Sequence, residues 1–261
     1  MQTPVSLFTS EQSTSESPAS KQFASGQPTS NPAVSGQAVT AAEQQAKTTE
    51  SAVVKPVGQA PEVNIQTPIA SAGFSAALSE LAVKASTCRL CGLSEERTKV
   101  VFGVGNPEAD LVFIGEAPGR DEDLQGEPFV GRAGQLLDRM LAAIGMDRDQ
   151  IYIMNTIKCR PPNNRDPKAD EVQACNLWFE QQLDLLQPKM ICLLGRVAAQ
   201  TVLKTDEPLG SLRGQWHDYQ GIPVWVTYHP AYLLRSPGQK QKSWQDLQTV
   251  LASFQKLNQV T

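Results

Sequence analysis

Four short hydrophobic runs in this chain each end on a polar residue. They are Leu111–Gly115 before Glu116, Ile151–Met154 before Asn155, Met190–Gly195 before Arg196, and Val224–Tyr228 before His229. The runs are aliphatic or β-branched with almost no alternation, which is typical of strands buried on both faces of a parallel sheet. Helix-length segments separate them, so the order of elements predicts an α/β fold.

We expect three layers, α/β/α, around a central, mostly parallel sheet of four strands. One covering helix has a clear pattern, since apolar residues recur at helical spacing after Gly131 and Gly145 follows as a stop signal. Ligands of open parallel sheets bind outside the carboxyl ends of the strands. The four polar residues that end the runs, Arg196 included, are therefore expected to converge on one cleft.

The first 75 residues have a different composition from the rest. They are rich in Ser, Thr, Gln, Ala and Pro and show no lasting periodicity, so we expect a disordered N-terminal tail. Residues 76–261 are enough for one domain with a real core. The N-terminus lacks the basic and apolar regions of a secretory signal, and no run approaches the ~18 apolar residues that span a bilayer. We expect a cytoplasmic protein with no membrane partner.

The charge balance argues mildly against a non-specific nucleic-acid binder, because the formal net charge is −4. Local charge can still matter. Lys158, Arg160 and Arg165 gather in one stretch, and a second basic stretch begins at Arg235. Such clusters are usually solvated surface, but these two lie beside the expected cleft.

Four of the five cysteines have a spacing that suggests a metal site. Cys88 and Cys91 form a C-x2-C pair, Cys159 follows the second run, and Cys175 lies on the next expected helix. Disulfides are not expected in a chain without an export signal. Four thiolates can close one site for zinc or for an iron–sulfur cluster, and spacing does not separate the two. Cys192 lies within a strand and is interpreted as a core residue.

The loop after the first run is rich in small residues, which let the backbone approach a ligand. No G-x-G-x-x-G follows the strand, which weakens a nucleotide-cofactor interpretation. Phe129 lies in this Pro/Gly-rich region, where an aromatic residue is either a hydrophobic staple or a stacking platform. Of the two histidines, His229 is the functional candidate because it ends a strand and precedes Pro230.

Together these motifs resemble those of the family 4 uracil-DNA glycosylases. The resemblance covers about Cys88 to Leu251 and rests on Gly115-Glu116-Ala117-Pro118-Gly119, Pro128-Phe129-Val130-Gly131, Asn155 with Lys158-Cys159-Arg160-Pro161-Pro162, His229-Pro230-Ala231-Tyr232-Leu233-Leu234-Arg235, and the four cysteines. It implies a monomeric DNA-repair enzyme that flips uracil out of single- or double-stranded DNA and hydrolyses its N-glycosidic bond. It also implies a 4Fe–4S cluster on Cys88, Cys91, Cys159 and Cys175.

The resemblance assigns roles to several cleft residues. Asn155 would read the Watson–Crick edge of uracil and reject cytosine, whose donors and acceptors are reversed. Phe129 would stack on the flipped base. Glu122 would form the wall that refuses the methyl group of thymine, and His229 would donate to uracil O2 as negative charge develops there.

Ala117 stands where relatives have an aspartate that activates water, so Glu116 is the candidate for orienting the water or steadying the cationic sugar. Arg235, after two leucines, is a candidate wedge that holds the base out of the duplex. No His-bearing basic insertion follows Asn155, which favours simple hydrolysis. Two alternatives are a non-catalytic iron–sulfur module that binds DNA and an enzyme acting on free nucleotides in the same crevice.

Overall fold

The computed structural model of the protein describes residues 71–259. Most of the expected N-terminal tail, residues 1–70, lies outside the described residues. Helix α1 (Ser71–Ser86) begins within the last five residues of that predicted segment. The apolar residues of α1 that pack into the core, Leu78, Leu81 and Ala85, all come later, so its first turn carries no amphipathic signal in the sequence.

The described sheet has six strands in the order β1-β3-β2-β4-β6-β5. The four predicted strands are confirmed and run parallel in its centre: β2 (Leu111–Gly115), β3 (Tyr152–Asn155), β4 (Met190–Leu194) and β6 (Ile222–Thr227). Two antiparallel edge strands were not predicted: β1 (Val104–Gly105) and β5 (Trp216–Tyr219). They lack a buried apolar run, because β1 is very short and β5 alternates exposed and half-buried residues.

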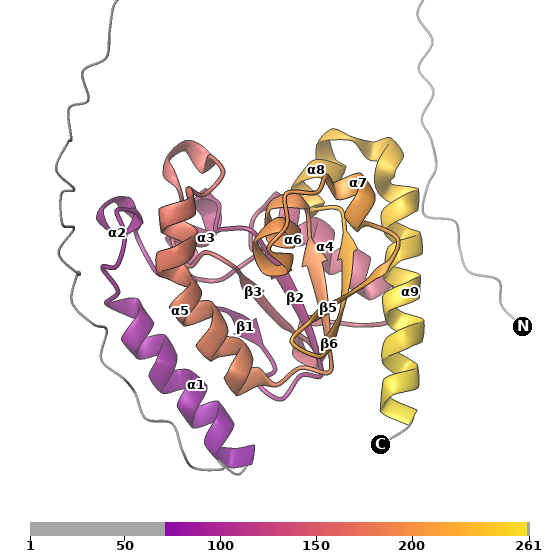
Figure 1. Ribbon diagram of the computed structural model, residues 1–261, viewed down its shortest axis with the longest axis horizontal. Helices are drawn as coiled ribbons and strands as arrows, with labels where there is room; N and C mark the ends of the chain where they lie inside the picture. The colour runs from indigo at the N-terminus through magenta and orange to yellow at the C-terminus, as the bar shows by residue number, and fades with distance from the viewer. Residues whose placement is uncertain (1–70, 260–261) are drawn as a thin grey trace, which may run out of the picture. The chain divides into compact units, whose positions relative to one another are not determined.

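Helices cover both faces of the sheet, as three layers require (Figure 1). After α1 they are α2 (Leu93–Glu96), α3 (Arg120–Gln125), α4 (Arg132–Ala143), α5 (Ala169–Leu186), α6 (Arg196–Leu203), α7 (Leu209–Leu212), α8 (Pro230–Arg235) and α9 (Lys240–Gln259). Short 3-10 turns are η1 (Arg148–Gln150), η2 (Pro162–Asn164) and η3 (Pro237–Gln239). The helix predicted after Gly131 is α4, and Gly145 beyond its end has a φ of +73°.

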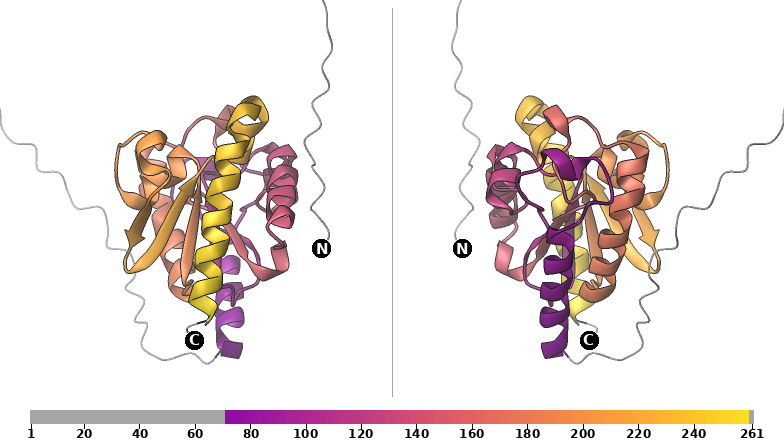
Figure 2. Two further views of the ribbon diagram at one scale, coloured as in Figure 1. Left: turned by 90° about the vertical axis from the view of Figure 1, so that its right-hand side faces the viewer. Right: turned by 90° about the vertical axis from the view of Figure 1, so that its left-hand side faces the viewer.

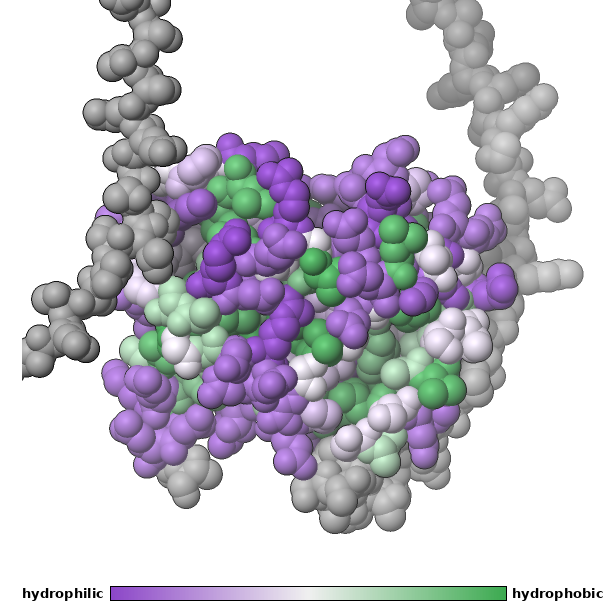
Figure 3. All heavy atoms as spheres, turned by 180° about the vertical axis from the view of Figure 1, so that it is seen from behind, coloured by the Kyte–Doolittle hydropathy of each residue, from purple (hydrophilic) through white to green (hydrophobic). Residues whose placement is uncertain are grey.

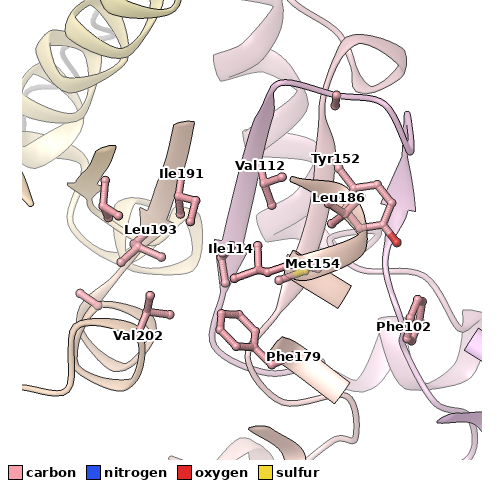
Figure 4. Packing of buried hydrophobic residues seen from close by; sticks show 14 of the residues in the cluster. Phe102, Val112, Ile114, Tyr152, Met154, Phe179, Leu186, Ile191, Leu193 and Val202 are labelled. Atoms are coloured by element: carbon pink, nitrogen blue, oxygen red, sulfur yellow. The ribbon is translucent and has the colours of Figure 1, made fainter. Parts of the chain in front are cut away.

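Each face of the sheet has its own hydrophobic cluster. On one face α1, α5 and α6 pack against side chains such as Ile114, Met154 and Leu193 (Figure 4). On the other face α4 and α9 pack against Phe113, Ile153 and their neighbours. Helices α1 and α5 run side by side (Figures 1 and 2). The central strands are therefore buried on both sides, which explains their unbroken hydrophobic sequences.

The strand register brings the polar endings to one edge. Gly115 of β2 lies opposite Asn155 of β3, and Leu194 of β4 lies opposite Thr227 of β6. One face of the described surface is mostly hydrophilic, with separate apolar patches (Figure 3). Among the described residues no helix is both long and apolar enough to cross a membrane.

Candidate functional site

A cleft of about 370 Å³ opens at the carboxyl edge of the parallel strands. Three of the four predicted strand endings line it: Glu116, Asn155 and His229. The other cleft residues predicted from the sequence also line it, namely Ala117, Glu122, Phe129 and Arg235. Residues that the prediction missed, Asp166 and Tyr232 among them, complete the wall. The size is ample for one nucleobase with its sugar, since ligand sites usually begin near ~300 Å³.

Arg196 was predicted wrongly as a cleft residue. It is the first residue of α6, and its guanidinium points to Asp166 (Nη2 to Oδ2, 2.6 Å) and to Gln200 (Nη1 to Oε1, 2.9 Å). Gly195 before it has a φ of +92°, so the chain turns sharply at the end of β4. Arg196 therefore acts on the cleft through its positive charge, which pairs with Asp166 and lowers the pKa of Glu116.

The Asn155 side chain is buried and incompletely paired. The residue is 2% exposed, and its Oδ1 has no hydrogen-bond partner among the described residues. Buried polar atoms are nearly always hydrogen-bonded, and an unpaired one costs about 1–3 kcal/mol. Because Asn155 also lines the cleft, its unpaired acceptor is a candidate contact for a ligand that donates a hydrogen bond.

Phe129 is held in a strained conformation next to His229. Its φ is +56°, which is rare for a residue with a bulky side chain. The two ring centroids are 5.5 Å apart with planes inclined by 30°. Gly134 packs against the Phe129 carbonyl so closely that an added Cβ would collide with it. Arg148 donates hydrogen bonds to the carbonyl oxygens of Pro128 (3.2 Å) and Phe129.

His229 presents one defined nitrogen to the cleft. It is the N-cap of α8, and its Nδ1 accepts a hydrogen bond from the Ala231 backbone N–H at 3.1 Å. An accepting Nδ1 leaves the proton of the neutral ring on Nε2. Burial lowers the pKa of His229 to about 4, and the positive charge of Arg235 acts in the same direction. His229 is thus a neutral donor at physiological pH.

Glu116 has an environment that favours its protonated form. Burial and, to a smaller extent, the carboxylate of Asp166 raise the pKa of Glu116 to about 7, against the opposing effect of the Arg196 guanidinium. Both protonation states are accordingly populated near neutral pH. The next residue, Ala117, brings no polar group to the cleft wall.

Glu122 joins the two loops that follow β2. Its Oε2 accepts from the Gly119 backbone N–H (3.1 Å), and its Oε1 accepts from those of Val130 (3.0 Å) and Gly131 (2.9 Å). Three backbone donors fix the carboxylate in the cleft wall. The same contacts place Phe129, one residue before Val130.

The four predicted cysteines line a second, smaller cavity. N–H groups donate to three of their sulfurs: Arg97 to Cys159 (3.3 Å), Trp178 to Cys88 (3.1 Å) and the Lys158 backbone to Cys175 (3.3 Å). Burial raises the pKa of Cys91, of Cys159 and, to about 11, of Cys175. Among the described residues, no three His, Cys, Asp or Glu side chains lie close enough to hold a single metal ion.

Lys158 was predicted wrongly as part of a basic surface cluster. Its side chain is fully buried, and its ammonium donates to Phe102 O (3.2 Å), Asn155 O (2.9 Å) and Gln182 Oε1. Burial lowers the pKa of Lys158 to about 7, while the thiols of Cys175 and Cys159 act in the opposite direction. The hydrogen bonds require the charged form, because three acceptors need three N–H groups. No spacing in the sequence signals this arrangement.

Comparison with known proteins identifies relatives of the chain. Residues 102–248 match the model of the uracil DNA glycosylase superfamily. A type-4 uracil-DNA glycosylase of Archaeoglobus fulgidus is 41% identical over 181 residues, which cover 66% of this chain and 91% of that protein. One of Thermotoga maritima is 42% identical over 151 residues, 57% and 79% of the two chains. A type-5 enzyme of Pyrobaculum aerophilum is 31% identical over 149 residues, 49% and 64%.

We predict that Arg148 stabilises the strained Phe129 loop. Arg148→Met leaves two backbone carbonyls without their donor and should lower the free energy of unfolding by about 1–3 kcal/mol. Asp138→Asn is the matched control, because it removes only the half-exposed partner of Arg148 (2.7 Å) and should cost less than about 1 kcal/mol. Urea unfolding of the two variants checks this. Equal losses would contradict a special role for the loop contacts.

Proposed function

The chain belongs to the uracil DNA glycosylase superfamily as a type-4 uracil-DNA glycosylase that excises uracil in DNA repair, and we propose that the cleft at the carboxyl edge of its sheet holds the flipped base. The observation that carries this proposal is the buried, unpaired Oδ1 of Asn155. Uracil presents an N3–H donor beside the O4 acceptor. The Asn155 amide can accept from N3–H with Oδ1 and donate to O4 with its NH₂ group.

The same amide discriminates against cytosine. Cytosine has an acceptor at N3 and a donor at N4. In a buried site its N3 would face the Asn155 acceptor, and its N4 amine would face the Asn155 NH₂ donor. A buried mismatch of this kind costs far more than the loss of an exposed hydrogen bond. Asn155 would recognise the base after it has flipped out of the DNA stack. Flipping itself costs a few kcal/mol.

Two further residues would fit the flipped ring. Phe129, held rigidly by its backbone contacts, supplies an aromatic face on which the base stacks, a contact worth about 1–3 kcal/mol and similar for every base. Glu122, fixed by three backbone N–H groups, is the wall beside C5 of uracil. A carboxylate there resists the methyl group of thymine, because burying the methyl would also remove water from the charge.

His229 acts on the bond that breaks. As the C1′–N1 bond lengthens, its electron pair passes to uracil and positive charge develops on the sugar. The Nε2–H of neutral His229 donates to uracil O2, where part of the negative charge collects. Stabilising such charge with a fixed donor in a water-poor site is usually the largest catalytic contribution. The fixed tautomer means that no reorientation is needed during the reaction.

Glu116 would act on the sugar and on the attacking water. The ionised carboxylate orients a water whose oxygen bonds to C1′, takes up the proton released, and steadies the cationic sugar before that bond forms. Ala117 leaves room for this water without supplying a base. A pKa near 7 suits a group that accepts a proton at neutral pH.

The DNA around the cleft would be held by α8 and its flanking residues. Arg235 lies at the cleft and ends α8, where it can enter the duplex and occupy the space left by the flipped nucleotide. Single- and double-stranded DNA containing uracil are both proposed substrates. We also propose that the protein acts as a monomer, and the substrate supports a location in the cytoplasm at the nucleoid.

We propose that Cys88, Cys91, Cys159 and Cys175 hold a 4Fe–4S cluster. Two observations support it: N–H donors point at three of the sulfurs, as they do around cluster thiolates, and the four side chains surround a cavity without converging on a point. A bound cluster supplies metal–thiolate bonds that stabilise the fold. These bonds would join α5 and the segment before α2 to the loop that follows Asn155.

We expect Asn155→Asp to reduce the release of free uracil from DNA and to raise the ratio of cytosine to uracil release. A carboxylate cannot donate to O4 of uracil but can accept from the exocyclic amine of cytosine. Asn164→Asp, on the rim of the same cleft, introduces the same charge and should leave that ratio unchanged. Release assays on both DNAs, with free deoxyuridine as a further substrate, check the proposal. Release of uracil from free deoxyuridine but not from DNA would identify an enzyme that acts on free nucleotides instead.

For His229→Ala we expect the single-turnover rate to fall by about 10²–10³, as for the loss of one oxyanion donor. Binding of a duplex with a non-cleavable uracil analogue should weaken far less, because the interaction strengthens only as the bond stretches. His217→Ala is the control, since His217 lies on β5, contacts the Leu212 carbonyl of α7, and does not line the cleft. Equal losses of rate and analogue affinity in His229→Ala would make the histidine a general binding residue.

Iron analysis tests the cysteine site. Protein purified without oxygen should be brown with about four iron atoms per chain, and Cys175→Ala should lose both colour and soluble yield. Cys192→Ala should keep the iron, because Cys192 is a buried residue in the middle of β4. Stoichiometric zinc without iron would overturn the assignment.

A further inference from the structure

Lys158 joins the two sites through a single residue. Its main chain belongs to the cysteine site: the backbone N–H donates to Cys175 Sγ at 3.3 Å, and the next residue is Cys159. Its side chain contacts a cleft residue: the ammonium donates at 2.9 Å to the carbonyl oxygen of Asn155. The side chain thus returns along its own loop to the last residue of β3.

The other polar groups of Lys158 are paired as well. The Gln182 side chain accepts from the ammonium and donates to Phe102 O (3.1 Å) and Tyr152 Oη (2.9 Å). The Lys158 carbonyl accepts from the Val101 backbone N–H at 2.8 Å. Every polar group of this buried residue is therefore paired.

The same loop also contacts Glu116, the residue that follows β2. The carbonyl of Glu116 accepts from the Thr156 hydroxyl at 2.7 Å and from the Ile157 backbone N–H at 3.0 Å. Residues 155–158 consequently carry backbone contacts to both polar residues that end β2 and β3. A shift of this loop would move Glu116 and Asn155 together.

We propose that Lys158 is a positioning residue that fixes the Asn155 amide for base reading. This inference rests on the proposed function of Asn155. Uracil and cytosine differ by an exchange of donor and acceptor, so a turn of the amide weakens discrimination as well as rate. The ammonium acts through the main chain of Asn155 and does not touch the substrate.

Lys158→Met is the direct test, because it keeps the length of the side chain and removes its three donors. Misplacement of a reading group by about 1 Å can cost 10²-fold, so we expect the single-turnover rate on uracil to fall at least about tenfold and the selectivity for uracil over cytosine to fall with it. Binding of abasic-site DNA, which offers Asn155 no base, should stay within about twofold of wild type. The visible spectrum of the cysteine site should be retained.

Gln182→Leu is the matched control for a merely structural role. It removes a fully buried partner of the ammonium but leaves the contact between Lys158 and Asn155. It should destabilise the fold while uracil selectivity stays at the wild-type value. Should Lys158→Met not fold, the shorter neutral Lys158→Gln carries the same comparison, and Lys158→Arg should recover part of the selectivity because it restores a cationic donor.

Two results would overturn the inference. One is wild-type selectivity in a folded Lys158→Met or Lys158→Gln variant. The other is a parallel loss of stability, uracil rate and abasic-site binding in the Lys158 and Gln182 variants alike. Both results leave uracil excision by the wild-type protein intact. Failure of the wild-type protein to release uracil from DNA would instead contradict the proposed function.

Discussion

The absence of a side chain at Gly115 is the constraint on which the cleft depends. A Cβ at this position would collide with Asn155 Oδ1 and would lie 2.6 Å from the ring of Phe129. Gly115 is the last residue of β2 and lies opposite Asn155 in the parallel register. Only glycine lets the amide and the aromatic ring occupy the same corner of the sheet, so the base-reading and stacking groups share a space that strand pairing creates.

The protonation states of the cleft residues follow from their burial. Burial keeps His229 neutral and raises the pKa of Glu116 to about 7, while Asp166 and Arg196 pair at the rim. The site thus offers a neutral donor on one side and a titrating carboxylate on the other. Departure of an anionic base and attack of water on a cationic sugar need these two kinds of group.

The four central strands, and three of the four polar endings, could be predicted because buried parallel strands have continuous apolar sequences. Arg196 could not, since the turn at Gly195 sends its side chain to Asp166 instead of into the cleft. The roles of Lys158 and Arg148 were missed because most of their hydrogen-bond partners are backbone carbonyls, which leave no trace in residue types. Sequence patterns therefore predict which residues end the strands, but not which residues hold them in place.

The central claim is that the unpaired Oδ1 of Asn155 accepts a hydrogen bond from the N3–H group of uracil. A crystal structure of the protein with free uracil or with uracil-containing DNA tests it most directly. The account predicts Asn155 Oδ1 within about 3 Å of uracil N3, the Phe129 ring stacked on the base, and His229 Nε2 at O2. A base bound elsewhere in the cleft, or an Asn155 Oδ1 paired with a protein group in the complex, would contradict it.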